Sequence, residues 1–465
     1  MNTEPLYRYR HLAHIVIEAK TPLVFGSGGK DILTDNMIAK DANGLPYIPG
    51  TTLAGTLRHA LGEVASDNLF GYKGDSSDDG LGSRIIFSEA KMLGPVMNSD
   101  GSEAIKVLEG LLQIDWSDDF YRHFKNLPVR QHVRIGRKGT VDGSGKFDEQ
   151  IIFKGIRFCF DIEIVSDEGS QEEMEQVLDA LYDETYTLGS GSRSGFGKIS
   201  VESIKTKTYN LTEKADEEAY LNFSSSLNSE RWTGVRDDRN HESRTGYTFK
   251  YTLELEPDNF FLFGSGRSDD DADMTPVRED VIEWTDDGKP RFVEALAFIP
   301  ASSVKGALAH RTAFHYNRKK CVFSDRCTRI EDYVGSNNEA VREIFGTEGK
   351  GGEDKARGKA LFSDIFKIGE SEEKILNHVA IDSFTGGAVD GALFSEKVLC
   401  NGPKFTTEIL LCEDVSQEAR EAFEAAVKDL CSGMLPLGGG ANRGHGIFSG
   451  SAERVDQNGE RISIY

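Results

Sequence analysis

The chain has 465 residues, of which 38% are hydrophobic, and its 54 basic and 77 acidic side chains give a formal charge of −23 at pH 7. At roughly 100–200 residues per domain, this length predicts about two to four domains, and the apolar content excludes a wholly disordered chain. The acidity excludes a simple basic nucleic-acid coat. Any nucleic-acid site would need a local basic stripe, backbone amides or partner subunits.

The cellular compartment is predicted from sequence features that the chain does not contain. No run of about 18 apolar residues occurs, so no membrane span is expected. The first twenty residues lack the apolar core of a signal peptide. The six cysteines form no CxxC pair. This pattern argues against a disulfide scaffold and favours a reducing, cytoplasmic compartment.

The main organising feature is an internal duplication. Six segments recur in the same order: FGSG at 25–28 and 263–266, YIPGTTLAG at 47–55 and FIPASSVKG at 298–306, LFG at 69–71 and IFG at 344–346, IFSE at 86–89 and LFSD at 361–364, HVRI at 132–135 and HVAI at 378–381, and LGSG at 188–191 and LGGG at 437–440. The order is kept and only loop lengths change. We therefore predict two copies of one module, in residues 1–205 and 246–465, joined by a polar linker at 206–245.

Each copy shows the same succession of elements. The first is predicted to contain a strand at 14–19, a helix at 53–61, a long strand at 151–165, an amphipathic helix at 172–184 and a closing strand at 196–204. The second repeats these at 249–255, 303–315, 405–412, 417–431 and 447–455. Thr51 or Thr52 is expected to cap the first helix. This order predicts an α+β fold with two tandem ferredoxin-like domains.

A glycine-rich loop lies between the last helix and the last strand of each copy, at 189–197 and 438–446. Glycine lets the backbone approach a ligand closely, and successive N–H groups can cup a phosphate. Arg193 and Arg443 add charge with a planar fork. The simpler alternative is a loop packed on its own sheet. Because the helix precedes the strand, a dinucleotide-binding fold is excluded.

The glycine loops, the run DNMIAKD at 35–41 and the run LPYIPGTTLAGTLR at 45–58 together resemble the RAMP superfamily of CRISPR-associated proteins. Within it they resemble the type III backbone (Cas-seven-like) subunits, here as two fused copies, as in subtype III-D variant complexes. The resemblance implies two RRM-like RAMP domains, each with a β-hairpin thumb. It also implies a role in antiviral defence, with CRISPR RNA, target RNA, other backbone subunits and a large polymerase-like subunit as partners.

The resemblance to this family also implies an activity. Its backbone subunits hold the guide RNA, and their thumbs wedge into the guide–target duplex. They cut the target beside each thumb, using Mg²⁺ or Mn²⁺ and an aspartate after the first strand. Asp35 lies in the matching run, ten residues after Phe25, as Asp273 lies ten after Phe263. Asp271, in the same acidic run, is the alternative to Asp273.

The chemistry of RNA explains why an aspartate would serve here. RNA carries its own nucleophile, the 2′-OH, and a splayed-out nucleotide can place it in line with the phosphorus. An aspartate can hold Mg²⁺, which offsets the developing negative charge, or accept the 2′-OH proton. Two alternatives are a non-catalytic RNA-binding scaffold and a metal-independent guide-processing ribonuclease. The second would need a histidine base, and none lies in the loop after the first strand.

The thumbs are predicted at 134–150 and 380–397, the first basic and the second carrying Phe384 and Phe394. His132 and His378, at the thumb roots, are interpreted as structural or RNA-contacting. The candidate RNA-binding residues are Lys40, Arg58, His132, Arg134, Arg137, Lys138, Gly189, Gly191, Arg193, Arg278, Lys305, His378, Gly438, Gly440 and Arg443.

A second kind of metal site is predicted in the second copy. His310, His315, Cys321 and Cys327 lie within eighteen residues. Histidine and cysteine at this density can bind Zn²⁺ tetrahedrally, although spacings of five, six and six do not match the usual knuckles. The alternative is a set of ordinary buried thiols and surface histidines.

Overall fold

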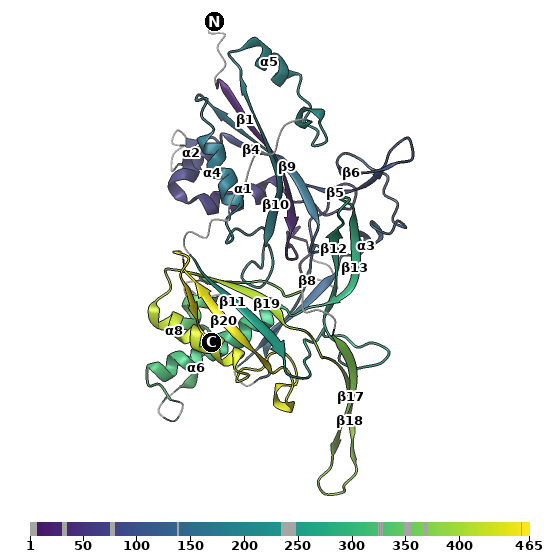
Figure 1. Cartoon of the computed structure of the whole chain (residues 1–465), viewed down its shortest axis with the longest axis vertical. Coiled ribbons are helices and arrows are strands. Elements are labelled where there is room, and N and C mark those ends of the chain that lie inside the picture. The colour runs from purple at the N-terminus through teal and green to yellow at the C-terminus, as the bar shows by residue number, and fades with distance from the viewer. Residues whose placement is uncertain are drawn as a thin grey trace.

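The computed structural model describes residues 7–29, 35–74, 80–136, 139–233, 248–323, 325, 327, 329–347, 355–366, 371–456 and 458–465. The chain forms two halves that follow one another along the long axis of the molecule (Figure 1). None of the helices in these ranges is both long and apolar enough to cross a bilayer.

The first half is built on an antiparallel sheet in the order β10-β1-β9-β5-β6, with β4 also paired to β9. Its strands are β1 (Tyr9–Ala19), β4 (Ile85–Phe87), β5 (Lys91–Met97), β6 (Glu103–Val107), β9 (Arg157–Ser166) and β10 (Ile199–Asn210). Helices α1 (Gly50–Leu61), α2 (Glu63–Phe70) and α4 (Glu172–Leu181) lie on one side of it (Figure 1). Leu57 of α1 and Leu178 of α4 are fully buried in the same core as Ile15 and Phe160 of the sheet.

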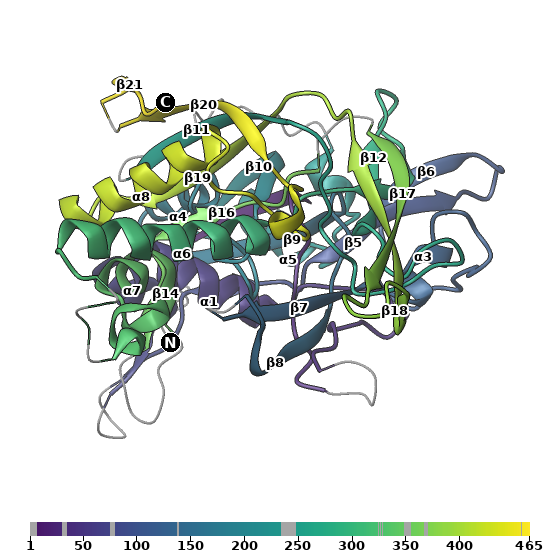
Figure 2. The ribbon, with the colours of Figure 1, turned by 90° about the horizontal axis from the view of Figure 1, so that it is seen from below.

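The second half repeats this arrangement. Its sheet has the order β16-β19-β11-β20-β21. The strands are β11 (Thr248–Pro257), β16 (Ala360–Phe362), β19 (Phe405–Cys412), β20 (Phe448–Val455) and β21 (Arg461–Ser463), and the helices are α6 (Ala301–Lys319), α7 (Glu339–Phe345) and α8 (Gln417–Cys431). Helices α6 and α8 lie side by side (Figure 2). The order β20-β11-β19-β16 matches β10-β1-β9-β4, so the predicted α+β fold with two tandem ferredoxin-like domains is confirmed.

Among the described residues, three long hairpins and two pairs of two-residue strands stand apart from the two main sheets. The first hairpin joins β7 (Val129–Ile135) to β8 (Val141–Gln150), and the second hairpin joins β17 (Glu372–Ile381) to β18 (Ala388–Cys400). These are the predicted thumbs, and both begin earlier than predicted. The second hairpin projects far from the body (Figure 1). A further hairpin, β12 (Arg278–Trp284) with β13 (Pro290–Ala297), was not predicted. The smaller elements are α3 (Arg122–Lys125) and the two-residue strands β2 (Tyr72–Lys73), β3 (Gly80–Leu81), β14 (Gly346–Thr347) and β15 (Ala356–Arg357).

Some local predictions were wrong. Helix α1 begins at Gly50 after Pro49 and has no side-chain cap, so Thr51 and Thr52 lie inside its first turn. The strand predicted over 151–165 begins only at Arg157, because the chain turns at Lys154 and Gly155 before it.

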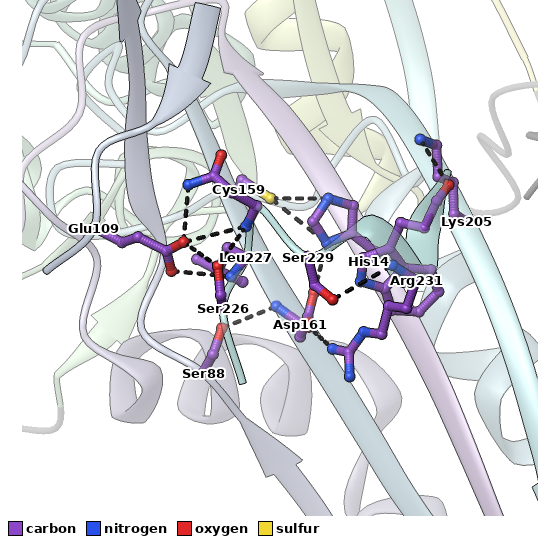
Figure 3. A network of polar contacts seen from close by, with 12 residues as sticks. His14, Ser88, Glu109, Cys159, Asp161, Lys205, Ser226, Leu227, Ser229 and Arg231 are labelled. Carbon is purple, nitrogen blue, oxygen red and sulfur yellow. Dashed lines mark hydrogen bonds and ion pairs between the residues drawn. The ribbon is translucent and has the colours of Figure 1, made fainter. Parts of the chain in front are cut away.

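The stretch after β10 packs back onto the first half, on β1 and β9. It contains α5 (Lys214–Leu221) and a short 3₁₀ turn at Glu230–Trp232. In Figure 3, His14 of β1, Asp161 of β9 and Arg231 of this turn point toward one another. Asp161 Oδ1 lies 2.6 Å from His14 Nδ1, and Asp161 Oδ2 accepts from Arg231 Nη2 at 2.5 Å. Trp232 stacks on His14 with ring centroids 5.2 Å apart, so this segment is anchored to the first sheet.

Candidate functional site

In both halves the loop after the first strand runs beside the return strand of the hairpin. A parallel bridge joins Asn36 to Glu149 in the first half, and its counterpart joins Met274 to Glu396 in the second. The residue before each bridge is therefore an aspartate at an equivalent place. This shared bridge makes Asp273 the structural counterpart of Asp35.

Each of these two aspartates is exposed and held by the hairpin. Asp35 Oδ2 accepts a hydrogen bond from the backbone N–H of Asp148 at 3.3 Å. Asp273 Oδ2 accepts from the N–H of Ser395 at 2.8 Å and from its hydroxyl at 3.0 Å. These bonds to Ser395 lower the pKa of Asp273, so its carboxylate is ionised at neutral pH. The hairpin thus fixes the position of each carboxylate.

Asp271 has a different environment. The ammonium of Lys397 lies 2.6 Å from Asp269 Oδ2 and 3.5 Å from Asp271 Oδ2. Asp271 therefore lies close to a lysine of the second hairpin. Among the described residues, the Asp271 carboxylate accepts no hydrogen bond from the backbone of that hairpin.

A single carboxylate at each site is compatible with Mg²⁺. This ion commonly binds through one or two carboxylates and completes its shell with waters and substrate phosphate oxygens. Within the described ranges, no three histidine, cysteine, aspartate or glutamate side chains gather into a group that could hold a metal alone. Asp35 or Asp273 could thus hold such an ion together with waters and the phosphates of a bound nucleic acid.

A stacked histidine–phenylalanine pair lies at the base of each hairpin. His132 and Phe147 are cross-strand partners with ring centroids 4.7 Å apart, and His378 and Phe394 repeat this at 4.8 Å. The predicted recurrence of the two histidines therefore marks a repeated structural feature. The flat aromatic faces are suited to stacking on a base.

A buried glutamate also lies at the base of each hairpin, and neither of the two was identified from the sequence. Glu396 is fully buried, with its Oε1 2.8 Å from His378 Nε2. Glu149 is 7% exposed and lies 3.7 Å from His132 Nε2. The signal was present as the triplet Phe-x-Glu at 147–149 and 394–396.

The two halves neutralise these glutamates differently. Glu149 faces Arg130 across the first hairpin; burial raises the pKa of Glu149, and Arg130 opposes that rise. In the second half Leu376 takes the place of Arg130. There the cation comes from the glycine loop, because Arg443 Nη2 donates to Glu396 Oε2 at 2.7 Å.

The environment of His132 leads to a pH prediction. Burial and the nearby Arg130 lower the pKa of His132 to about 4, whereas a free histidine has a pKa of about 6.5. Between these values the unfolded chain binds more protons, so this group's contribution to stability is lost as the pH falls from about 6.5 to about 4. A histidine-ring NMR titration is expected to show His132 neutral at pH 5, with its signal assigned by His132→Gln. A ring that titrates near pH 6.5 would contradict this.

A cavity of about 430 Å³ opens beside the first site. Its lining comes from the loop after β1 (Gly26, Asn36), the hairpin base (His132, Phe147) and the glycine loop (Ser190, Gly191). This volume falls within the range of small-ligand pockets, about 300–1,000 Å³. Asn36 follows Asp35 directly in the chain, so the cavity opens close to this aspartate, although the Asp35 side chain does not line it.

The predicted glycines are needed for packing of the loops on their own sheets. A Cβ on Gly189 would lie 2.3 Å from the carbonyl oxygen of Val24, and one on Gly438 would lie 2.5 Å from that of Leu262. Gly191 and Gly440 are closed in the same way by the following Phe196 and His445.

The structure describes most of the basic residues named from the sequence. Several are engaged with protein: Arg193 Nε donates to the Gly358 carbonyl at 2.7 Å, Lys40 to that of Phe124 at 3.2 Å, Arg58 pairs with Asp67 at 2.9 Å, and Arg278 contacts Ala295 and Glu373. Burial and the adjacent Arg357 lower the pKa of Arg193 to about 10. Arg134, exposed on the first hairpin, and Lys305, half-buried on α6, also interact with other residues of the chain. Arg137 and Lys138 lie outside the described residues.

The four predicted zinc ligands are not brought together, since no three of them form a group. His315 Nε2 lies 2.6 Å from Asp429 Oδ2, and Cys327 donates to the carbonyl of Phe323. His310 lies 3.4 Å from the carbonyl of Ile135, and Cys321 is exposed.

The repeated module, its hairpin and its aspartate define a class that comparison with known proteins identifies. The family model of the RAMP superfamily matches residues 16–200 and 284–449, and the chain belongs to this superfamily. The CRISPR system Cms endoribonuclease Csm3 of Methanocaldococcus jannaschii is 28% identical over 244 residues, which are 47% of this chain and 93% of that protein. The Csm3 of Methanothermobacter thermautotrophicus is 22% identical over 192 residues, 37% of this chain and 75% of that protein. The chain thus carries two tandem RAMP domains.

Proposed function

We propose that the chain binds CRISPR RNA within a type III ribonucleoprotein and cleaves the complementary target RNA, with one site in each half. The observation that carries this proposal is the repeated placement of Asp35 and Asp273, each fixed by the return strand of a hairpin. The relatives' description as endoribonucleases supports the activity.

In this account the hairpins separate bases and the sites receive the exposed nucleotide. The cavity beside Asp35 takes a splayed-out nucleotide, with the His132–Phe147 pair as an aromatic face near it. The 2′-OH then attacks the adjacent phosphorus in line. A new O2′–P bond forms, the P–O5′ bond breaks, and the products are a 2′,3′-cyclic phosphate and a 5′-OH.

Each aspartate has one of two roles in that reaction. Its carboxylate either accepts the 2′-OH proton or anchors a divalent cation at the scissile phosphate. Mg²⁺ or Mn²⁺, when bound, supplies positive charge that offsets the negative charge developing on the phosphoryl oxygens.

The two hairpins are proposed to meet the RNA in different ways. Arg134, exposed on the first hairpin, supplies a positive charge for phosphates. Phe384, at the tip of the second hairpin, is 96% exposed and supplies an apolar wedge.

The charge of −23 leads to a salt prediction. The isolated chain is expected to bind RNA weakly, because the channel is completed by partner subunits. Within the assembled complex, the logarithm of the association constant should fall linearly with the logarithm of the salt concentration, because bound phosphates release counterions. Filter binding at several salt concentrations measures this slope. An affinity that does not change with salt would contradict the proposal.

A cleavage assay separates this function from its alternatives. The complex is assembled with a guide RNA and given complementary target, non-complementary RNA or precursor guide, each with Mg²⁺ or with EDTA. We expect cuts only in the complementary target and only with Mg²⁺. Absence of cleavage with tight binding would favour a scaffold, and precursor cleavage in EDTA would favour guide processing.

A further inference from the structure

The two halves are joined by a buried arginine. Arg130, at the root of the first hairpin, donates to both carboxylate oxygens of Glu279 at 2.7 Å and to Asp364 Oδ2 at 2.6 Å. Its guanidinium lies 4.7 Å from the ring centroids of Phe196, from the first half, and Phe298, from the second. All three charged side chains are at least nine-tenths buried.

Two glycines allow the halves to approach this closely. Gly195 bridges to Ser363, and a Cβ at Gly195 would lie 2.5 Å from that of Ala301. A Cβ at Gly266 would lie 2.3 Å from the side-chain oxygen of Gln131. The contact therefore joins the hairpin root and glycine loop of one module to a different face of the next, which is a head-to-tail arrangement.

The duplication shows where the same contact would recur. Leu376 occupies the place of Arg130, because each lies opposite the buried glutamate of its hairpin, Glu396 or Glu149.

The face that receives Arg130 also has a counterpart in the first half. Glu89 corresponds to Asp364, since each directly precedes the residue that forms an isolated bridge to the segment just before the first helix of its half. Asp41 corresponds to Glu279, since each pairs through its backbone with a leucine, Asp41 with Leu45 and Glu279 with Leu296.

Both counterpart surfaces are open. Gly444, the counterpart of Gly195, has no atom within 4 Å of its Cβ position among the described residues. The same holds for Gly28, the counterpart of Gly266. A head-to-tail contact that can recur at both ends of a chain generates an open filament.

Two side chains oppose that recurrence. Leu376 is uncharged, so it cannot pair with the carboxylates of Glu89 and Asp41 as Arg130 pairs with those of Asp364 and Glu279. Lys91 lies 4.7 Å above the ring of Tyr47 and 2.7 Å from Glu89. Tyr47 corresponds to Phe298. Lys91 therefore lies over the Tyr47 ring of the first half in the way that Arg130 lies over the Phe298 ring of the second half. Phe366 stands at the position of Lys91 there and stacks on Phe298.

We propose that this contact is made once, inside the chain, and that Leu376 and Lys91 prevent another copy of the chain from repeating it. The physical reason is that Leu376 brings no cation to this face, while Lys91 already occupies the place beside Glu89 and over Tyr47 that an incoming side chain would need. This inference needs only the fold and does not depend on RNA cleavage.

Two single variants of the full chain test the proposal by sedimentation velocity. Leu376→Arg supplies the missing cation, and Lys91→Phe clears the site that receives it. We expect each variant alone to remain a monomer, as does the wild type, and their mixture to form a 1:1 pair. Its association constant should exceed that of any single protein by at least about tenfold. The double variant Leu376→Arg/Lys91→Phe should form chains.

The matched control is Leu393→Arg, which adds the same charge to the same hairpin at a position that is 70% exposed and does not lie opposite Glu396. Its mixture with Lys91→Phe should stay monomeric, and adding Glu89→Lys to Lys91→Phe should abolish pairing with Leu376→Arg. Leu376→Lys is a second cation donor should Leu376→Arg fail to fold. The proposal is overturned if the complementary mixtures remain monomeric, or if wild-type chains self-associate and Glu89→Lys dissociates them.

Discussion

Replacing Asp35 with alanine is expected to abolish one target cut and leave the other, and Asp273→Ala should do the reverse. Each carboxylate is fixed by the hairpin of its own half, so each serves one site. Loss of a group that stabilises the transition state usually costs about 10²–10³ in rate. The rates are read from end-labelled target RNA cut by the assembled complex, where the two cuts give fragments of different length.

The matched control is Asp271→Ala, which removes an exposed carboxylate from the same loop. It should retain both cuts, because Asp273 rather than Asp271 has the position of Asp35. Loss of the second cut in Asp271→Ala but not in Asp273→Ala would transfer the role to Asp271. Unchanged cleavage in the Asp35→Ala/Asp273→Ala double variant would remove both aspartates from the reaction.

Arg130→Met is expected to destabilise the full chain by about 3–5 kcal/mol. The change would leave Glu279 and Asp364 buried without their cation. Burial raises the pKa of both acids, and Arg130 opposes that rise. Without Arg130, the folded-state pKa of each acid lies above its unfolded-state pKa. The loss of stability caused by Arg130→Met should therefore grow as the pH rises. Urea unfolding at pH 5 and pH 8 measures both effects.

Arg122→Met is the control, because it also breaks an ion pair between the halves. Arg122 Nη2 lies 2.8 Å from Glu294 Oε1, and both side chains are about half exposed. Surface pairs of this kind contribute about 0–1 kcal/mol. Adding Glu279→Gln and Asp364→Asn to Arg130→Met should recover much of the loss. Equal effects of Arg130→Met and Arg122→Met would show that the buried cluster does not hold the halves together.

The duplication, the glycine loops and the hairpins could be predicted from the sequence because each is encoded by a short local pattern. Asp35 was found through its motif, and Asp273 through equal spacing from a repeated phenylalanine. In both cases the information lies within a few residues of the site. The fold then adds what the motif does not contain, which is the hydrogen bond from the hairpin.

The remaining features depend on contacts between residues far apart in the sequence. Arg130 meets partners 149 and 234 positions away, so nothing near it marks it as buried. Glu149 and Glu396 are ordinary acids until the hairpin pairs them with a histidine. The placement of the proposed zinc ligands also depends on the fold: at about 3.6 residues per turn, His310 and His315 lie on different sides of α6.

The most direct test of the account is a density map of the assembled complex with guide and a non-cleavable target RNA bound. We expect a splayed-out target nucleotide beside each hairpin base, with its phosphate within about 5 Å of the Asp35 or Asp273 carboxylate, close enough for direct or ion-bridged contact. Target RNA that passes both hairpins fully stacked, with both carboxylates far from any phosphate, would contradict the proposed activity.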